Sequence, residues 1–192
     1  MNKDENYEKP RNFKELIEFS TKNFKNNVAY KYTEDFTSQN PKVIEKTYEI
    51  VGKDIKALAT ALLERGFGGK RIAIIGSNRY EWVTSYFALQ AGGIVAAPMD
   101  KMLPKIEIES LIQRSSVDAI IFEKDKLEIF KELKSQKTNN LNTLICMDNV
   151  RDKDVGNFSD LLKEGYELLK QKNNKYEKVE IDNEKMSIML FT

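Results

Sequence analysis

Two glycine-containing segments are candidates for phosphate binding. Gly66-Phe67-Gly68-Gly69-Lys70 has the composition of a phosphate-binding loop, but such a loop follows a strand and opens a helix. Here the glycines follow a predicted helix and precede a predicted strand, which favours a turn. Gly76-Ser77-Asn78 lies between a predicted strand and a helix, where ligands of open α/β sheets bind. It lacks the G-x-G-x-x-G spacing, and helix capping by Asn78 is the favoured interpretation.

A group of basic residues could bind an anion. Its members are Arg79, Lys101, Lys105 and Arg114. They lie among as many acidic residues, which is typical of a solvated face of mixed charge.

Three aromatic residues, Trp82, Tyr86 and Phe87, could line an acyl pocket. Their helical spacing favours a core-facing stripe. Spacing alone therefore assigns no catalytic residue and no metal ligand.

The composition excludes several chemistries. The 192 residues include no histidine, which rules out a Ser-His-Asp triad, a Cys-His pair and a histidine-liganded zinc within this chain. The single cysteine, Cys146, lies in an apolar run, and we expect an inert buried thiol in a reducing compartment. The net charge of +1 gives no reason to expect nucleic acid or an anionic membrane as partner.

The localisation predicted from the sequence is cytoplasmic. The first twelve residues are polar and lack the apolar core of a signal peptide. The chain contains no run approaching the ~20 apolar residues of a transmembrane segment.

Short apolar runs alternate with amphipathic segments over most of the chain. Helices are predicted at 12–24, 53–65, 78–91, 104–115, 125–135 and 159–164, and buried strands at 71–75, 94–97, 119–122, 143–147 and 187–191. Asn78 with Glu81 and Asp125 with Glu128 have the spacing of capping boxes. Pro98 is expected to end its strand and Gly165 its helix.

This alternation predicts an α/β fold with a largely parallel sheet flanked by helices on both faces. Near the N-terminus, 28–33 and 43–50 are predicted to pair as antiparallel strands at an edge. We expect residues 1–11 to be a flexible N-terminus and 12–192 to be a single α/β domain.

The sequence from Thr47 to Pro104 resembles the N-terminal region of the adenylate-forming (AMP-binding) enzymes, which include acyl-CoA synthetases, luciferases and peptide-synthetase adenylation domains. The matching motifs are Leu58-Ala59-x-x-Leu62, Asn78-Arg79-x-Glu81-Trp82 and Pro98-Met99-Asp100-Lys101, followed by Leu103-Pro104. The second and third most resemble the long-chain fatty-acid–CoA ligase branch. Residues 187–192 are similar to the strand that leads into that family's phosphate-binding loop, and the resemblance covers roughly 12–192.

The resemblance implies an ATP-dependent, AMP-forming fatty-acid–CoA ligase that uses ATP, CoA and Mg²⁺ on a fatty acid. Thr192 would be the first residue of the ATP phosphate loop and the candidate cofactor-binding residue. The family's other nucleotide, magnesium and catalytic motifs follow that loop. We therefore expect a ligase truncated at the start of the loop, inactive by itself and binding no cofactor tightly.

Two alternatives from other functional classes stay open. The chain could be a stand-alone α/β nucleotide-binding module, with Gly76-Ser77-Asn78 as its turn. It could also be an interaction module that forms a homo-oligomer through apolar surface near Phe191.

Overall fold

The computed structural model describes residues 9–34, 39–136 and 138–191, so most of the predicted flexible N-terminus (1–11) lies outside the described residues. The element order is α1 (Phe13–Asn23), β1 (Val28–Glu34), β2 (Lys42–Thr47), α2 (Tyr48–Glu64), β3 (Arg71–Ile75), α3 (Tyr80–Ala91), β4 (Val95–Met99), α4 (Lys105–Ser115), β5 (Ala119–Phe122), the 3₁₀ turn η1 (Lys124–Lys126), α5 (Leu127–Ser135), β6 (Thr143–Cys146), β7 (Gly156–Asn157) and α6 (Phe158–Lys170).

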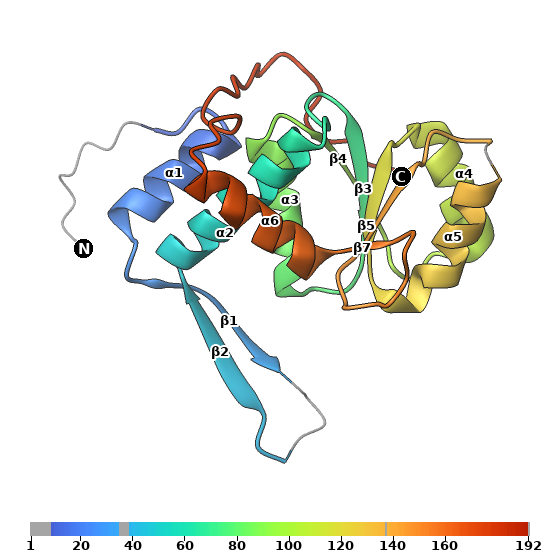
Figure 1. Cartoon of the computed structure of the whole chain (residues 1–192), viewed down its shortest axis with the longest axis horizontal. Helices are drawn as coiled ribbons and strands as arrows, with labels where there is room; N and C mark the ends of the chain where they lie inside the picture. The colour runs from blue at the N-terminus through green and yellow to red at the C-terminus, as the bar shows by residue number, and fades with distance from the viewer. Residues whose placement is uncertain (1–8, 35–38, 137, 192) are drawn as a thin grey trace.

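A parallel sheet with the strand order β4-β3-β5-β6-β7 forms the centre of the fold, as predicted. Its strands are apolar runs that bury alternate side chains on opposite faces. Ile72 and Ile74 of β3 pack in one core with α2, α3 and α6. Ala73 and Ile75 pack in a second core with α4 and α5. Helices therefore cover both faces of the sheet (Figure 1).

The antiparallel pair of β1 and β2 is a separate two-stranded sheet and not an edge of the parallel one. It projects from the body as an arm (Figure 1). The predicted strand 43–50 is too long, because α2 begins at Tyr48. Thr47 ends β2 and caps the helix, since its side chain accepts a hydrogen bond from the Ile50 amide at 3.4 Å.

The base of this arm is anchored by a buried polar group, Asp54 of α2. The Asp54 carboxylate accepts hydrogen bonds from the Tyr80 hydroxyl at 2.6 Å and the Tyr166 hydroxyl at 2.5 Å. Lys46 of β2 lies 3.8 Å from Asp54 and 5.1 Å from the centre of the Tyr80 ring. Tyr32 of β1 stacks on Tyr80 with 5.8 Å between ring centres. One buried carboxylate thus connects the arm to α2, α3 and α6.

Helix α6 is longer than predicted, because it continues through Gly165 to Lys170. Gly165 is buried where α6 crosses α2, and a Cβ atom added there would lie 1.9 Å from the Ala57 carbonyl oxygen. The glycine permits close packing of two helices and does not end one.

Both predicted capping boxes are wrong. The N-cap of α3 is Arg79, without a side-chain capping bond, so Asn78 does not cap this helix. Asp125 lies within the 3₁₀ turn, and α5 begins two residues later at Leu127.

The outer edge of β4 also differs from the prediction. Pro98 lies within β4, opposite Ile74, and does not end it. A proline is tolerated there because β4 is at the edge of the described sheet. The predicted strand 187–191 pairs with β4 through a single parallel bridge, Ala96 to Ile188. None of the helices in the described part of the chain has the length and hydrophobicity of a transmembrane span.

Candidate functional site

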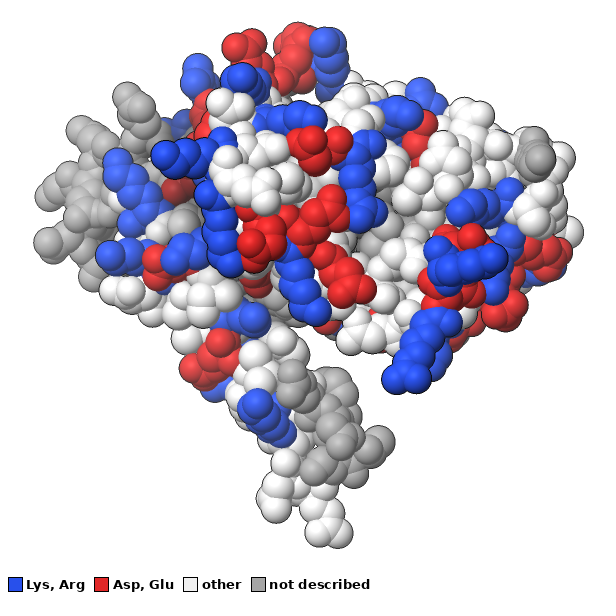
Figure 2. Space-filling view, viewed as in Figure 1, with Lys and Arg blue, Asp and Glu red and all other residues white. Residues whose placement is uncertain are grey.

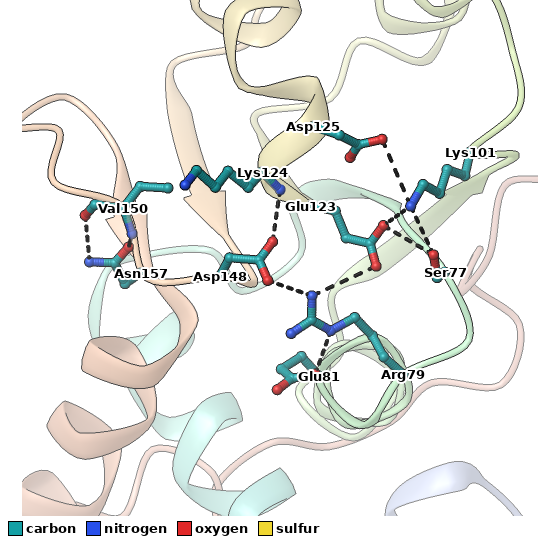
Figure 3. A network of polar contacts seen from close by, with 10 residues as sticks. All are labelled: Ser77, Arg79, Glu81, Lys101, Glu123, Lys124, Asp125, Asp148, Val150 and Asn157. Carbon is teal, nitrogen blue, oxygen red and sulfur yellow. Dashed lines mark hydrogen bonds and ion pairs between the residues drawn. The ribbon is translucent and has the colours of Figure 1, made fainter. Parts of the chain in front are cut away.

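The loops that follow β3, β4, β5 and β6 meet at the carboxyl edge of the parallel sheet, the edge at which open α/β proteins bind ligands. Each loop contributes charged or polar side chains to one network (Figure 3). We refer to five of these residues as the edge cluster: Ser77, Arg79, Lys101, Glu123 and Asp148.

Glu123 is the most buried member of the edge cluster, with 7% of its surface exposed. It follows the central strand β5, and one of its carboxylate oxygens accepts a hydrogen bond from the Ser77 hydroxyl at 3.1 Å. The same oxygen pairs with the Lys101 ammonium, which also donates to the Ser77 hydroxyl at 2.9 Å. Glu123 therefore connects the loops after β3, β4 and β5.

Arg79 extends the network to β6. Its guanidinium donates to Glu81 and to Asp148, each at 2.7 Å, and lies 3.7 Å from Glu123. Asp148 also accepts a hydrogen bond from the Lys124 amide at 2.8 Å. Each charged member of the edge cluster thus pairs with at least one other member, and Glu123 is the buried one.

These contacts change the acidity of two carboxyl groups. Burial by itself would raise the pKa of Glu123, but the hydrogen bonds from Lys101 and Ser77 outweigh it and lower the pKa. Burial opposes ionisation of Asp148 in the same way, and Arg79 with the Lys124 amide lowers that pKa. Both groups are therefore charged at neutral pH.

Acidification is expected to remove stability that these groups provide. A lowered carboxyl pKa contributes stability above its unfolded value, here 4.5 for Glu123 and 3.8 for Asp148. The contribution is lost as the pH falls through the lower folded value. Urea unfolding between about pH 6 and about pH 3 should show a shallower decline for Asp148→Asn than for the wild type. Glu132→Gln, at an exposed ion pair with Lys105, is the control, and equal slopes for Asp148→Asn and wild type would contradict this role.

The edge cluster occupies the position of the ligand crevice in related topologies. The chain leaves β3 for α3 on one face and β5 for α5 on the other, so the crevice falls between these strand ends. A Cβ atom on Gly76 would lie 3.3 Å from the Glu123 side chain and 3.2 Å from the Met147 sulfur. Protein side chains fill this crevice, which argues against Gly76-Ser77-Asn78 as the turn of a nucleotide-binding module.

A cleft of about 420 Å³ lies beside the edge cluster, where the chain reaches Phe191. Its lining residues are Pro98, Met99, Asp100, Leu103, Glu107, Ser110, Leu111, Arg114 and Phe191. The Arg114 guanidinium lies 5.8 Å from the centre of the Phe191 ring. Thr192, the predicted phosphate-loop residue, lies outside the described residues.

The four basic residues considered as an anion site are in three different environments. Arg79 and Lys101 belong to the edge cluster, where both are half-buried and pair with the buried carboxylate of Glu123, so they are less solvated than the prediction of a mixed-charge face implies. Lys105 pairs with Glu132 on the surface at 2.6 Å, and Arg114 lines the cleft. On the face shown in Figure 2, basic and acidic side chains are interspersed.

The aromatic residues of α3 pack against the core, as their spacing predicts. Trp82, Tyr86 and Phe87 are half-buried, and Trp82 stacks on Tyr86 with 5.7 Å between ring centres. Phe13 of α1 packs against both Tyr86 and Phe87, with 6.1 Å and 5.9 Å between the respective ring centres.

Two other predictions are confirmed. The segment from Gly66 to Lys70 is the turn from α2 to β3, and Gly66 and Gly69 adopt positive φ angles of 81° and 71°. Cys146 is a buried free thiol whose pKa is raised by burial.

In residues 9–34, 39–136 and 138–191, no cluster of three or more potential His, Cys, Asp or Glu ligands could hold a metal ion.

The parallel sheet, its polar carboxyl edge and the segment that runs along β4 towards a cleft define an open α/β domain with helices on both faces. The chain belongs to the AMP-binding enzyme family, whose sequence profile matches residues 18–192. This result confirms the resemblance noted from the motifs.

Several of the proteins to which this chain is similar are CoA ligases. Over 109 residues, the chain is 28% identical to 4-hydroxybutyrate–CoA ligase 2 of Metallosphaera sedula, covering 56% of this chain and 20% of that protein. Its fold matches a long-chain fatty-acid–CoA ligase from Archaeoglobus fulgidus with a TM-score of 0.76 at 16% identity, covering 97% and 35% of the two chains. Coronafacic acid ligase from Pectobacterium brasiliense gives 0.72 at 19% identity, covering 94% and 33%. The chain thus spans about a fifth to a third of these relatives' lengths.

Proposed function

We propose that this chain is the N-terminal part of an ATP-dependent, AMP-forming ligase that joins a long-chain fatty acid to CoA. The observation that carries the proposal is the family match, which extends from residue 18 to residue 192 and includes the cleft where the chain reaches Phe191. The choice of fatty acid is supported by the resemblance of Asn78-Arg79-x-Glu81-Trp82 and of 98–101 to that branch. A cytoplasmic location remains a prediction.

The proposed reaction has two steps. A fatty-acid carboxylate attacks the α-phosphate of ATP, which gives acyl-adenylate and releases pyrophosphate. The CoA thiol then attacks the acyl carbon and displaces AMP. Such chemistry depends on positioning the reactants and stabilising phosphate charge, here with Mg²⁺ and the phosphate loop that we propose to begin at Thr192.

The protein that contains this chain is expected to exchange pyrophosphate into ATP when a long-chain fatty acid is present. The assay should compare palmitate with 4-hydroxybutyrate and coronafacic acid, the carboxylates named by two of the similar proteins. Greater exchange with either of these would contradict the proposed substrate. No exchange with any carboxylate would contradict the proposed reaction.

Residues 1–192 alone are proposed to be inactive, since the family's other nucleotide and catalytic motifs follow the phosphate loop. The isolated chain should give no pyrophosphate exchange, and ATP should leave its melting temperature unchanged. A melting temperature that rises with ATP would instead support a stand-alone nucleotide-binding module. Self-association also remains a prediction, and exposed Met186 and Leu190 beside β4 favour it.

A further inference from the structure

Three large apolar side chains around the loop after α1 are exposed to solvent. Phe24 is the C-cap of α1 and is 38% exposed, Val28 begins β1 and is 48% exposed, and Ile50 lies in the first turn of α2 and is 38% exposed. Val28 pairs with Thr47, whose hydroxyl accepts a hydrogen bond from the Ile50 amide. The Phe24 ring lies 6.0 Å from the ring of Tyr48, the residue that follows Thr47. We refer to Phe24, Val28 and Ile50 as the apolar tip, which lies at the root of the arm (Figure 1).

Backbone hydrogen bonds hold the loop of the apolar tip in place. The Asn27 amide donates to the Phe24 carbonyl at 2.8 Å, and the Asn27 carbonyl accepts a hydrogen bond from the Tyr48 amide at 3.0 Å. The Lys25 carbonyl accepts a hydrogen bond from the Glu49 amide at 3.1 Å. The loop is therefore fixed to the first turn of α2 and presents its apolar side chains outward.

The apolar tip is flanked by positive charge. Residues 19–33 contain three lysines and no acidic residue. Two of them, Lys22 and Lys25, are exposed and form no ion pair or side-chain hydrogen bond within the described part of the chain. Glu49, the acidic residue next to Ile50, is bound to Lys53 at 2.9 Å. The tip therefore carries unbalanced positive charge, although the net charge of the whole chain is only +1.

An apolar cleft of about 410 Å³ adjoins the tip at Tyr48. It lies between α1, β1, α2 and α3, and Leu16, Val51 and Phe87 are among its lining residues. None of the described residues that line it is charged. Leu16 is itself 42% exposed, so the apolar surface continues from the tip along α1. A partner that covers this surface must offer both an apolar region and negative charge.

We propose that the apolar tip, together with Lys22 and Lys25, docks on the surface of an anionic lipid bilayer. The apolar side chains enter the boundary between headgroups and acyl chains, and the two ammonium groups contact anionic headgroups. A bilayer supplies an apolar layer and negative charge at one surface, which matches the two properties of the tip. Because only three apolar side chains and two charges take part, the attachment is weak and reversible. This role goes beyond the proposed function, and lipid binding tests it without any ligase activity.

The whole protein should sediment with vesicles of phosphatidylcholine that contain about 30% phosphatidylserine, and should bind pure phosphatidylcholine vesicles about tenfold more weakly. Lys22→Gln/Lys25→Gln should weaken binding to the anionic vesicles about tenfold. Val28→Thr/Ile50→Gln should weaken binding to both kinds of vesicle about tenfold, because it removes apolar contacts. All four side chains are exposed, so the melting temperature should stay that of the wild type.

Each variant has a matched control. Ile106→Gln controls for the apolar variant, because Ile106 is 75% exposed and lies in the first turn of α4. Lys153→Gln/Lys163→Gln changes the net charge by the same amount as the lysine variant, at exposed positions in the loop before β7 and on α6. Both controls should bind vesicles like the wild type.

A wild-type protein that binds neither kind of vesicle would overturn the proposal. Losses in the controls as large as those in the tip variants would also overturn it, by showing that the location of the residues is unimportant. Wild-type dimers that form without lipid and dissociate in Val28→Thr/Ile50→Gln would identify a second copy of the chain as the occupant of the tip instead.

Discussion

Replacing Gly165 with alanine is expected to destabilise the chain by about 3 kcal/mol. The added Cβ would lie 1.9 Å from the Ala57 carbonyl oxygen and 2.4 Å from the carbonyl carbon. These are backbone atoms within helix α2, so α2 and α6 must separate to make room. The cost is expected even though alanine favours a helix over glycine by about 1 kcal/mol. Urea unfolding followed by circular dichroism measures the difference.

Gly52→Ala is the matched control, since Gly52 is also a helical glycine in close contact. Its added Cβ would lie 2.1 Å from the Thr21 hydroxyl oxygen and 3.0 Å from Thr21 Cγ2, but these are atoms of a partly exposed side chain on α1, so a small shift of Thr21 makes room without moving α2 from α6. We expect a loss below about 1 kcal/mol. Equal losses for the two variants would show that the backbone contact at Gly165 is not the cause.

Replacing Asp54 with alanine should cost about 3 kcal/mol. Asp54 is 5% exposed, and its carboxylate accepts hydrogen bonds from two tyrosine hydroxyls, both of which would lose this partner. Burial and the neighbouring carboxylate raise the pKa of Tyr80, and burial likewise raises that of Tyr166, so both hydroxyls remain donors at neutral pH. Lys46 would also lose an ion pair, which should loosen the arm of β1 and β2.

Tyr166→Phe provides the comparison for Asp54→Ala. It removes one of the hydroxyl donors and leaves Tyr80 bound to Asp54, so we expect a loss of about 1 kcal/mol. Urea unfolding gives both values, and hydrogen exchange in β1 and β2 reports on the arm. A loss for Asp54→Ala no larger than that for Tyr166→Phe would contradict the anchoring role of the carboxylate.

The sheet was predictable because its strands are continuous apolar runs. Ala119–Phe122 is buried on both faces, and its predicted bounds are those of β5. Such a run, followed by a helical stripe, leaves few arrangements besides a parallel sheet covered by helices. The local turn at Gly66 was equally clear, since glycine adopts positive φ at little cost.

Features that depend on contacts between distant segments were not predictable. Gly165 has the sequence signature of a helix end, and only the approach of Ala57 explains its position inside α6. The first residues of α2 have the composition of a strand, but capping by Thr47 starts the helix. Asn78 and Asp125 had suitable spacing for caps, yet the chain turns elsewhere.

The candidate site was only partly predictable. Arg79 and Lys101 were identified as candidates, but their partners Glu123 and Asp148 were missed. A usable signal existed, because Glu123 directly follows β5 and Asp148 lies two residues after β6. Acidic residues at the ends of adjacent parallel strands must meet at one edge of the sheet. Their pairing with cations from other loops could not be read from spacing.

The late position of residues 187–191 in the sequence affects the order in which the fold can be completed during synthesis. Strands β3 to β6 and their helices leave the ribosome before these residues do, so β4 keeps an unpaired outer edge for the time needed to translate α6 and the loop after it. Exposed strand edges are sites of chain association. Nascent chains ending before Ser187 should therefore be the most aggregation-prone, and completion of this segment is the step that protects the sheet.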